Sequence, residues 1–232
     1  TFLQRAYDQI INDLCINNSN ALILVYRASI YGNKDMTHLG FNDITMLSNM
    51  PNLMYLAPTT VEELESSIRY GVEHHNHPIA IRIPVGLPIY ETSQSNTTGC
   101  PVTSCNITQS GNTIAIIGVG NFYHKAVELS QAIHDAIHIF PTLVKPLCIS
   151  SLDTDTLNEL TKNHNIVITL EDGELEGGYG QKIASYYGKT SINVLNYGIS
   201  KQFYDRYNPE DVLQQNHLDF EHILDDIQNI QH

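Results

Sequence analysis

The sequence predicts an α/β protein made of two αβα domains with mainly parallel sheets. Strand-sized apolar runs alternate with amphipathic helical segments in both halves of the chain, as they do in layered α/β folds. A chain of 232 residues is long enough for two domains of about 100 residues each. A stretch rich in Pro, Ser, Thr, Asn and Gly, from Pro84 to Asn112, interrupts the alternation. We therefore expect one domain over residues 1–90, a linker over 91–112 and a second domain over 113–232.

The first half opens in a helix. Apolar residues recur at three- and four-residue spacing from Leu3 to Leu14, which predicts a helix from the first residue to about Cys15. Because no capping residue precedes this helix, we expect the sequence to continue a longer protein upstream. Thr60 and Glu63 form a capping-box pattern at the start of a later helix. The other expected elements are strands over 21–26, 53–57 and 79–83, a loop over 27–40, and helices over 43–49 and 60–73.

The second half repeats the alternation of strands and helices. Its most regular segments are an apolar strand over 113–119 and an amphipathic helix over 122–137. A Gly-rich loop over 173–180 leads into a helix that ends near Gly188. The other expected elements are strands over 139–144, 166–170 and 192–195, a helix over 154–163, and helices that begin near Pro209 and Phe220.

Charge and composition exclude several kinds of partner. Twelve Lys and Arg against 25 Asp and Glu give a formal net charge of -13, which repels phosphate backbones and anionic lipid. We therefore expect no nucleic acid and no membrane as partners, and no apolar run approaches the ~20 residues that cross a bilayer. The four cysteines are scattered and no signal peptide is present, so we expect reduced thiols and a cytoplasmic location. Cys100 and Cys105 could close a small loop, but no second pair completes a zinc site, and we expect no metal ligands.

Two glycine-containing motifs and a histidine cluster favour structural interpretations. Gly118-Val119-Gly120 lacks the third glycine of a dinucleotide fingerprint, which favours a tight turn between strand and helix. Glu171-Asp172 precedes a Gly-rich stretch, but its charge would repel an anion, which favours a structural or interface loop. His74, His75 and His77 lie at a predicted helix end before a proline, where exposed histidines are common.

Arg27, Asp35 and His38 lie in or beside the loop that follows the first predicted strand. Open α/β sheets bind ligands at the carboxyl ends of their strands, so this loop is a candidate site. Arg27 can bind an anion and His38 can transfer a proton near neutral pH. From the residues alone, a histidine that only satisfies its own loop is an equally good interpretation.

The opening nine residues, Thr1-Phe2-Leu3-Gln4-Arg5-Ala6-Tyr7-Asp8-Gln9, closely resemble a segment of the 1-deoxy-D-xylulose-5-phosphate synthase family. These are thiamine-diphosphate enzymes of the transketolase superfamily. The resemblance covers essentially the whole chain and assigns the first domain to pyrimidine binding and the second to the family's C-terminal domain. Further matches occur in the same order along the chain: Arg27-Ala28, Gly32, Thr37-His38, Gly40, Val144-Lys145-Pro146-Leu147, Glu171, Gly177-Gly178 and Asn196-Tyr197-Gly198-Ile199.

The resemblance implies roles for four residues. Phe2 matches the aromatic residue that stacks on the aminopyrimidine ring of the cofactor, and Arg5 matches a residue close to that ring. Arg27 matches an arginine that binds the phosphate of glyceraldehyde 3-phosphate. His38 matches a histidine beside the reacting substrate, where it binds substrate and moves protons as a catalytic residue.

The resemblance also implies a reaction and partners. The family condenses pyruvate with glyceraldehyde 3-phosphate, using thiamine diphosphate and Mg²⁺. The glutamate that activates the pyrimidine, and the domain that binds diphosphate and Mg²⁺, precede the matched region in the family. We therefore expect them on an upstream domain or a separate chain, and we expect these 232 residues alone to be inactive. The family's site lies between subunits or domains, which implies a homodimer.

Four positions depart from the family pattern. Tyr26 replaces an acidic residue, Ser29 replaces a glycine, and Lys34 stands where the family has an aspartate. Val85 replaces a second phosphate-binding arginine, which implies weaker binding of the acceptor or a different aldehyde. A divergent transketolase, a ketoacid dehydrogenase beta-type subunit and a noncatalytic regulatory module of the same fold remain alternatives.

Overall fold

The computed structural model describes residues 2–32, 35–73, 76–84 and 105–231, and it confirms an α/β fold with two αβα units. The first unit contains a parallel three-stranded sheet of order β1-β3-β2. The second contains a five-stranded sheet of order β4-β6-β5-β7-β8, in which only β4 runs antiparallel. The strands are β1 Leu22–Ala28, β2 Met54–Leu56, β3 Ile79–Pro84, β4 Cys105–Gln109, β5 Thr113–Val119, β6 Thr142–Pro146, β7 His164–Glu174 and β8 Asn193–Ile199.

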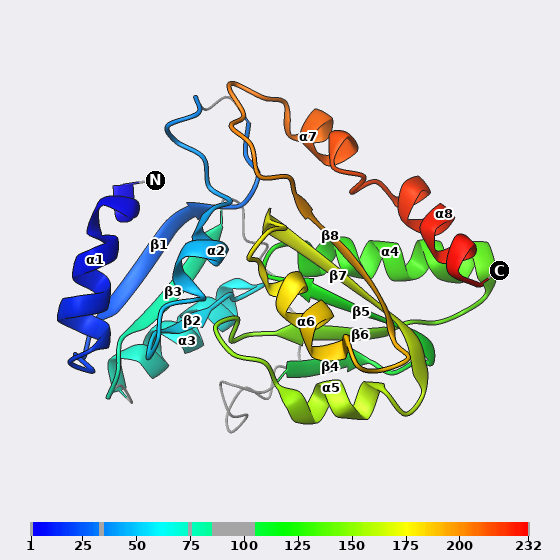
Figure 1. Ribbon diagram of the computed structural model, residues 1–232, viewed down its shortest axis with the longest axis horizontal. Helices are drawn as coiled ribbons and strands as arrows, with labels where there is room; N and C mark the ends of the chain where they lie inside the picture. The colour runs from blue at the N-terminus through cyan, green and yellow to red at the C-terminus, as the bar shows by residue number, and fades with distance from the viewer. Residues whose placement is uncertain (1, 33–34, 74–75, 85–104, 232) are drawn as a thin grey trace.

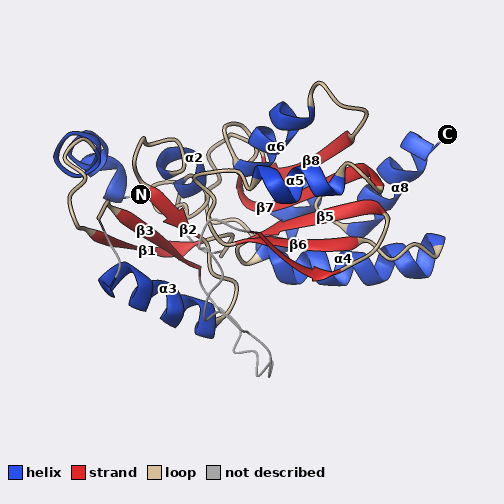
Figure 2. Ribbon diagram, turned by 90° about the horizontal axis from the view of Figure 1, so that it is seen from below, coloured by secondary structure: helices blue, strands red, loops and turns tan. Residues whose placement is uncertain are grey.

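Helices cover both faces of each sheet (Figures 1 and 2). In Figure 2, α3 lies on one face of the first sheet, and α1 and α2 lie on the other. For the second sheet, α4 and α8 share one face, and α5 and α6 share the opposite face. The α-helices are α1 Tyr7–Gln9, α2 Asp43–Leu47, α3 Val61–Glu73, α4 Phe122–Ile137, α5 Thr154–Leu160, α6 Tyr179–Tyr187, α7 Pro209–Gln215 and α8 Phe220–Gln231.

The helix predicted at the start of the chain is present, with a mixed geometry. A 3₁₀ segment over Phe2–Ala6 leads into α1, and a π-helical segment over Ile10–Cys15 follows. Its buried contacts come from the second half of this segment, where Ile10 and Cys15 pack into the core. In the Phe2–Ala6 turn, Leu3 and Ala6 pack against this core while partly buried, whereas Phe2, Gln4 and Arg5 are exposed to solvent.

Several strands differ from their predicted bounds: β6 was predicted over 139–144 and β8 over 192–195, and the largest differences concern β4 and β7. Residues 105–109, expected in the linker, form β4, which pairs with β6 at the edge of the second sheet. This strand is short and mostly exposed, so its sequence lacks the apolar run that marks a buried strand. β7 extends through Glu174, because Glu171 pairs with Val119 of β5 and Glu174 pairs with Ile199 of β8. The boundaries of the two domains remain a prediction, and the residues 85–104 lie outside the described ranges.

The predicted capping box at α3 is displaced by one residue. The Glu63 backbone N–H donates to the Thr60 hydroxyl at 3.2 Å, as predicted. The Glu63 carboxylate, however, accepts from the backbone and hydroxyl of Thr59 at 2.9 and 2.8 Å. Lys145 of β6 forms an ion pair with the same carboxylate, so this helix start is tied to the second sheet.

One apolar cluster joins the two units. Tyr55 and Leu47 of the first unit belong to the same buried cluster as Ile117 and Ile183 of the second. Continuous packing of this kind holds the two sheets as neighbours. None of the helices in the described ranges combines the length and apolar character needed to cross a bilayer.

Candidate functional site

The candidate site begins where β1 ends. The strand is irregular between Tyr26 and Ala28, and Arg27 has a positive φ of 62°. Ser29 also has a positive φ of 86°, which explains physically why a glycine suits this position in the family that the sequence resembles. The chain then folds back, and the Ser29 backbone N–H donates to the Gly40 carbonyl at 2.8 Å. A side chain at Gly40 would lie 2.2 Å from the Arg27 carbonyl oxygen, so this close return requires glycine.

Within this loop, Asp35, Thr37 and His38 form a local hydrogen-bonded turn. The Asp35 carboxylate accepts from the Thr37 backbone N–H at 3.0 Å and also from the Thr37 hydroxyl. It lies 3.1 Å from Nδ1 of His38. The hydrogen bonds from Thr37, followed by that from His38, lower the pKa of Asp35 to about 2. The carboxylate is therefore ionised at neutral pH. Together with the Thr37 hydroxyl, which lies 2.8 Å from Nδ1, it orients the imidazole.

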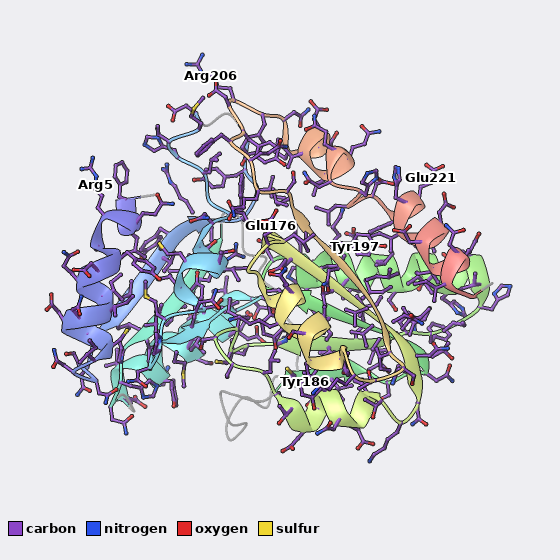
Figure 3. The ribbon with its side chains drawn as sticks, viewed as in Figure 1. Arg5, Glu176, Tyr186, Tyr197, Arg206 and Glu221 are labelled. Atoms are coloured by element: carbon purple, nitrogen blue, oxygen red, sulfur yellow. The ribbon has the colours of Figure 1, made fainter. Side chains whose placement is uncertain are left out.

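The N-terminal turn brings Phe2 to this imidazole. The ring centroids of Phe2 and His38 lie 5.4 Å apart with an interplanar angle of 80°, an edge-to-face contact. Phe2 is 72% exposed, so most of its ring remains available to another aromatic surface. Arg5 follows in the same turn and projects from the outer edge of the N-terminal segment (Figure 3).

The structure therefore brings together two of the four predicted site residues, Phe2 and His38, with Asp35 beside them. Arg27 is exposed at the base of the same loop. Burial raises the pKa of Tyr31, and the charge of Arg27 opposes part of this increase. Tyr31 itself donates to the His38 carbonyl at 3.3 Å. Lys34 and Val85, the two departures that concern the substrate, lie outside the described residues.

A buried ion cluster centred on Arg82 was not predicted from the sequence. The guanidinium of Arg82 in β3 is fully buried. Its Nε donates to Asp43 of α2 at 2.7 Å, and its Nη1 donates to Asp172 of β7 at 2.5 Å. The hydroxyl of Tyr55 donates to the same Asp43 carboxylate. This cluster joins both units of the fold through charged hydrogen bonds.

The sequence held one signal for this cluster. Arg82 is the only charged residue in the apolar run Ile79–Ile83, and a lone arginine in a buried strand needs a carboxylate partner. Its partners come from distant segments, however, and only the fold identifies them. The prediction of a structural or interface loop at Glu171-Asp172 is right about the structural role, because Asp172 is fully buried against Arg82, but wrong about the loop, because both residues belong to β7.

Glu171 has a structural role at the start of α6. Its carboxylate accepts from the backbone N–H groups of Tyr179 and Gly180, both at 2.9 Å. Burial raises the pKa of Glu171 to about 7, against the lowering effect of those two hydrogen bonds. A side chain at Gly178 would approach this carboxylate to 2.6 Å, so the glycine permits the helix start to close on it.

The remaining sequence motifs have plain structural explanations. A side chain at Gly118 would lie 2.6 Å from Cα of Tyr123, which confirms the tight turn before α4. Cys15, Cys105 and Cys148 are free thiols, and Cys100 lies outside the described residues. His74 and His75 also lie outside the described residues, whereas His77 contacts the side chain of its neighbour Asn76. In the described ranges, no group of three or more His, Cys, Asp or Glu is arranged to hold a metal ion.

Comparison with known proteins connects this geometry to a family. Residues 1–88 match the family model of the transketolase pyrimidine-binding domain, and residues 103–223 match that of the transketolase C-terminal domain. The 1-deoxy-D-xylulose-5-phosphate synthase of Alkaliphilus oremlandii is 34% identical over 230 residues, covering 98% of this chain and 36% of that protein. The enzyme of the same name from Gloeothece citriformis is 32% identical over 233 residues, with the same two coverages. This chain thus spans about a third of the length of these curated relatives.

A solved structure supports the fold assignment. A protein described as a split gene transketolase, inactive beta4 tetramer, superimposes with a TM-score of 0.83. The alignment covers 98% of this chain and 73% of that one, at 20% sequence identity. At that identity, the similarity establishes the shared fold of the two-unit chain.

Proposed function

The chain belongs to the transketolase family, and we propose that it forms the pyrimidine-binding and C-terminal part of a thiamine-diphosphate-dependent transferase. The proposed reaction is that of 1-deoxy-D-xylulose-5-phosphate synthase, the condensation of pyruvate with glyceraldehyde 3-phosphate. The observation that carries the proposal is the contact between Phe2 and His38 at the carboxyl end of β1. These residues come from separate segments, yet both match the family's cofactor and substrate positions.

The described residues fit the flat pyrimidine half of the cofactor. Phe2 offers an exposed aromatic face, and Arg5 lies in the same turn with its guanidinium free to approach a ring. When bound, thiamine diphosphate supplies the electron sink for the decarboxylation of pyruvate. The role of Phe2 is to orient the ring, and burial of that face on binding favours the complex.

His38 and Arg27 are the proposed substrate residues. With a proton on Nδ1 directed at Asp35, His38 presents Nε2 to the substrate and can transfer a proton there. Arg27, exposed at the base of the loop, would bind the acceptor phosphate through its planar fork of donors.

The proposal requires groups from outside these 232 residues. We infer that an upstream domain or a separate chain provides the diphosphate site, the Mg²⁺ ligands and the glutamate that activates the pyrimidine. We also infer a homodimer, because Phe2 and Arg5 are exposed in the single chain and the family's sites lie between subunits or domains. Sedimentation that finds only monomer at micromolar concentration would contradict the homodimer.

A substrate panel tests the reaction. The natural polypeptide that carries these residues is assayed with thiamine diphosphate, Mg²⁺ and pyruvate plus glyceraldehyde 3-phosphate, and in parallel with a ketose donor or a lipoyl acceptor. We expect condensation only in the first assay. Turnover confined to the ketose donor would indicate a transketolase, and turnover confined to the lipoyl acceptor would indicate a dehydrogenase subunit.

A matched pair of variants tests the site. His38→Gln is expected to lower kcat about 10²-fold or more, because the proton-transfer group is removed. His222 is a suitable control, since it is also an exposed histidine paired with an aspartate three residues earlier. His222→Gln should leave kcat unchanged, and an equal loss in both variants would contradict the assigned role of His38.

A further inference from the structure

The loop that carries His38 is anchored in the second unit of the fold. Phe41, three residues after His38, is fully buried in the apolar cluster of the second sheet. Its ring meets Tyr204 edge-to-face, with centroids 5.5 Å apart. The Phe41 carbonyl accepts the backbone N–H of Glu174, at the end of β7, at 2.9 Å. The second unit therefore fixes the main chain immediately after the candidate catalytic residue.

A side-chain hydrogen-bond relay extends from this anchor to the cofactor segment. Nδ2 of Asn42 donates to Oε2 of Glu174 at 2.7 Å. The other end of the same amide accepts from Nε2 of Gln4 at 3.2 Å. Gln4 lies between Phe2 and Arg5 in the N-terminal turn. The relay Gln4–Asn42–Glu174 thus links the cofactor segment, the His38 loop and β7 of the second unit.

We propose that Glu174 is a positioning residue, which holds the Phe2 and His38 side chains in one arrangement through Asn42 and Gln4. The importance of this arrangement for catalysis rests on the proposed function, whereas the relay itself rests on the contacts alone. Leu3 and Ala6 of this turn are partly buried against the core, and the hydrogen bond from Gln4 adds a restraint on the exposed side of the turn. Glu174, by contrast, is buried, and its carboxylate is a fixed acceptor.

The surroundings of Glu174 suit this role. Burial raises the pKa of Glu174, and the hydrogen bond from Asn42 lowers it by favouring the ionised form. Hydrogen bonds to charged acceptors are stronger than those between neutral groups. Removal of the carboxylate would leave the Asn42 amide without its strongest partner, and both attached segments would gain freedom.

Nuclear magnetic resonance of the 232-residue chain tests the relay without any need for turnover. The imidazole resonances of His38 carry a ring-current shift from Phe2, whose size is defined by a Phe2→Leu reference. Glu174→Ala should move these resonances at least halfway to their positions in Phe2→Leu. Backbone amides of residues 38–43 should exchange with solvent about tenfold faster or more in the same variant.

Three further variants complete the experiment. Glu174→Gln keeps an oxygen acceptor at the same length, and it should restore the native resonances. Glu176, in the exposed turn after β7 (Figure 3), provides the matched control, and Glu176→Ala should leave them unchanged. If Glu174→Ala does not fold, Gln4→Leu breaks the relay at its exposed end and should produce the same resonance shift.

The proposal is overturned if Glu174→Ala, or Gln4→Leu in its place, keeps the native His38 resonances and the native amide exchange. It is also overturned if Glu176→Ala shifts them as much as Glu174→Ala does. Because no cofactor or substrate is used, either failure leaves the proposed reaction unaffected. Failure of the substrate panel, in turn, leaves the relay unaffected.

Discussion

At the scale of single residues, removal of the Arg82 guanidinium should strongly lower the free energy of unfolding. Arg82→Met leaves the carboxylates of Asp43 and Asp172 buried without their cation, and such a loss costs about 3–5 kcal/mol. Urea denaturation of the 232-residue chain measures the change. Arg69→Met, on the exposed side of α3, should change the free energy of unfolding by less than about 0.5 kcal/mol. Equal effects of the two substitutions would show that the ion cluster contributes nothing beyond an ordinary surface arginine.

The raised pKa of Glu171 predicts how the free energy of unfolding depends on pH. Its folded-state pKa of about 7 lies above the ordinary value of 4.5, so the folded protein holds the proton more tightly than the unfolded chain. The contribution of Glu171 to stability therefore falls as pH rises from about 4 to about 8, by about 3 kcal/mol in total. The free energy of unfolding of the wild type minus that of Glu171→Gln, measured with urea across this range, should decline by about 3 kcal/mol. A difference that is flat, or that grows with pH, would contradict the raised pKa.

A substitution at Val85 tests the identity of the acceptor substrate. The family that the chain resembles has a phosphate-binding arginine at this position, and one charge-assisted hydrogen bond contributes about 1.5–3 kcal/mol. Val85→Arg in the natural polypeptide should therefore lower the KM for glyceraldehyde 3-phosphate about tenfold or more, with the KM for pyruvate unchanged. Steady-state kinetics that show no change in the acceptor KM would indicate that the natural acceptor is a different aldehyde.

At the scale of elements, Asp153 stabilises the start of α5 and the edge strand β4 together. Its carboxylate accepts from the Thr156 backbone at 3.1 Å and from the Cys105 backbone at 2.8 Å. Asp153→Ala should lower the free energy of unfolding by about 1–3 kcal/mol, because it removes a helix cap and leaves a strand N–H unpaired. Asp155→Ala, in the exposed first turn of the same helix, serves as the control and should cost less than about 1 kcal/mol. Thermal or urea unfolding of both variants measures these two changes in the free energy of unfolding.

Elements with a strong local pattern could be predicted from the sequence, and those defined by distant partners could not. β5 and α4 have the predicted bounds, because their apolar patterns are encoded locally. β4 is an exposed edge strand whose pairing with β6 decides its conformation. At the site, Phe2 and His38 were predicted through a family resemblance, but the Asn42–Glu174 hydrogen bond joins residues 132 apart in the chain, and nothing local to either residue indicates it.

At the scale of the whole molecule, the second unit contributes none of the four predicted site residues, yet it fixes the loop that carries one of them. Phe41, Asn42 and Asp43 all contact the second unit or the cluster that spans both units. A chain in which the two units moved independently would lose this arrangement. The continuous core and the Arg82 cluster therefore serve the site as well as stability.

The most direct test of the proposed function is the release of carbon dioxide from pyruvate labelled at its carboxyl carbon, with thiamine diphosphate and Mg²⁺ present. The natural polypeptide should release carbon dioxide at a rate that rises on addition of glyceraldehyde 3-phosphate. The 232-residue chain alone should release none if, as proposed, an upstream domain or a separate chain supplies the diphosphate site and the activating glutamate. Turnover by the chain alone, or a natural polypeptide that does not consume pyruvate, would contradict the proposed function.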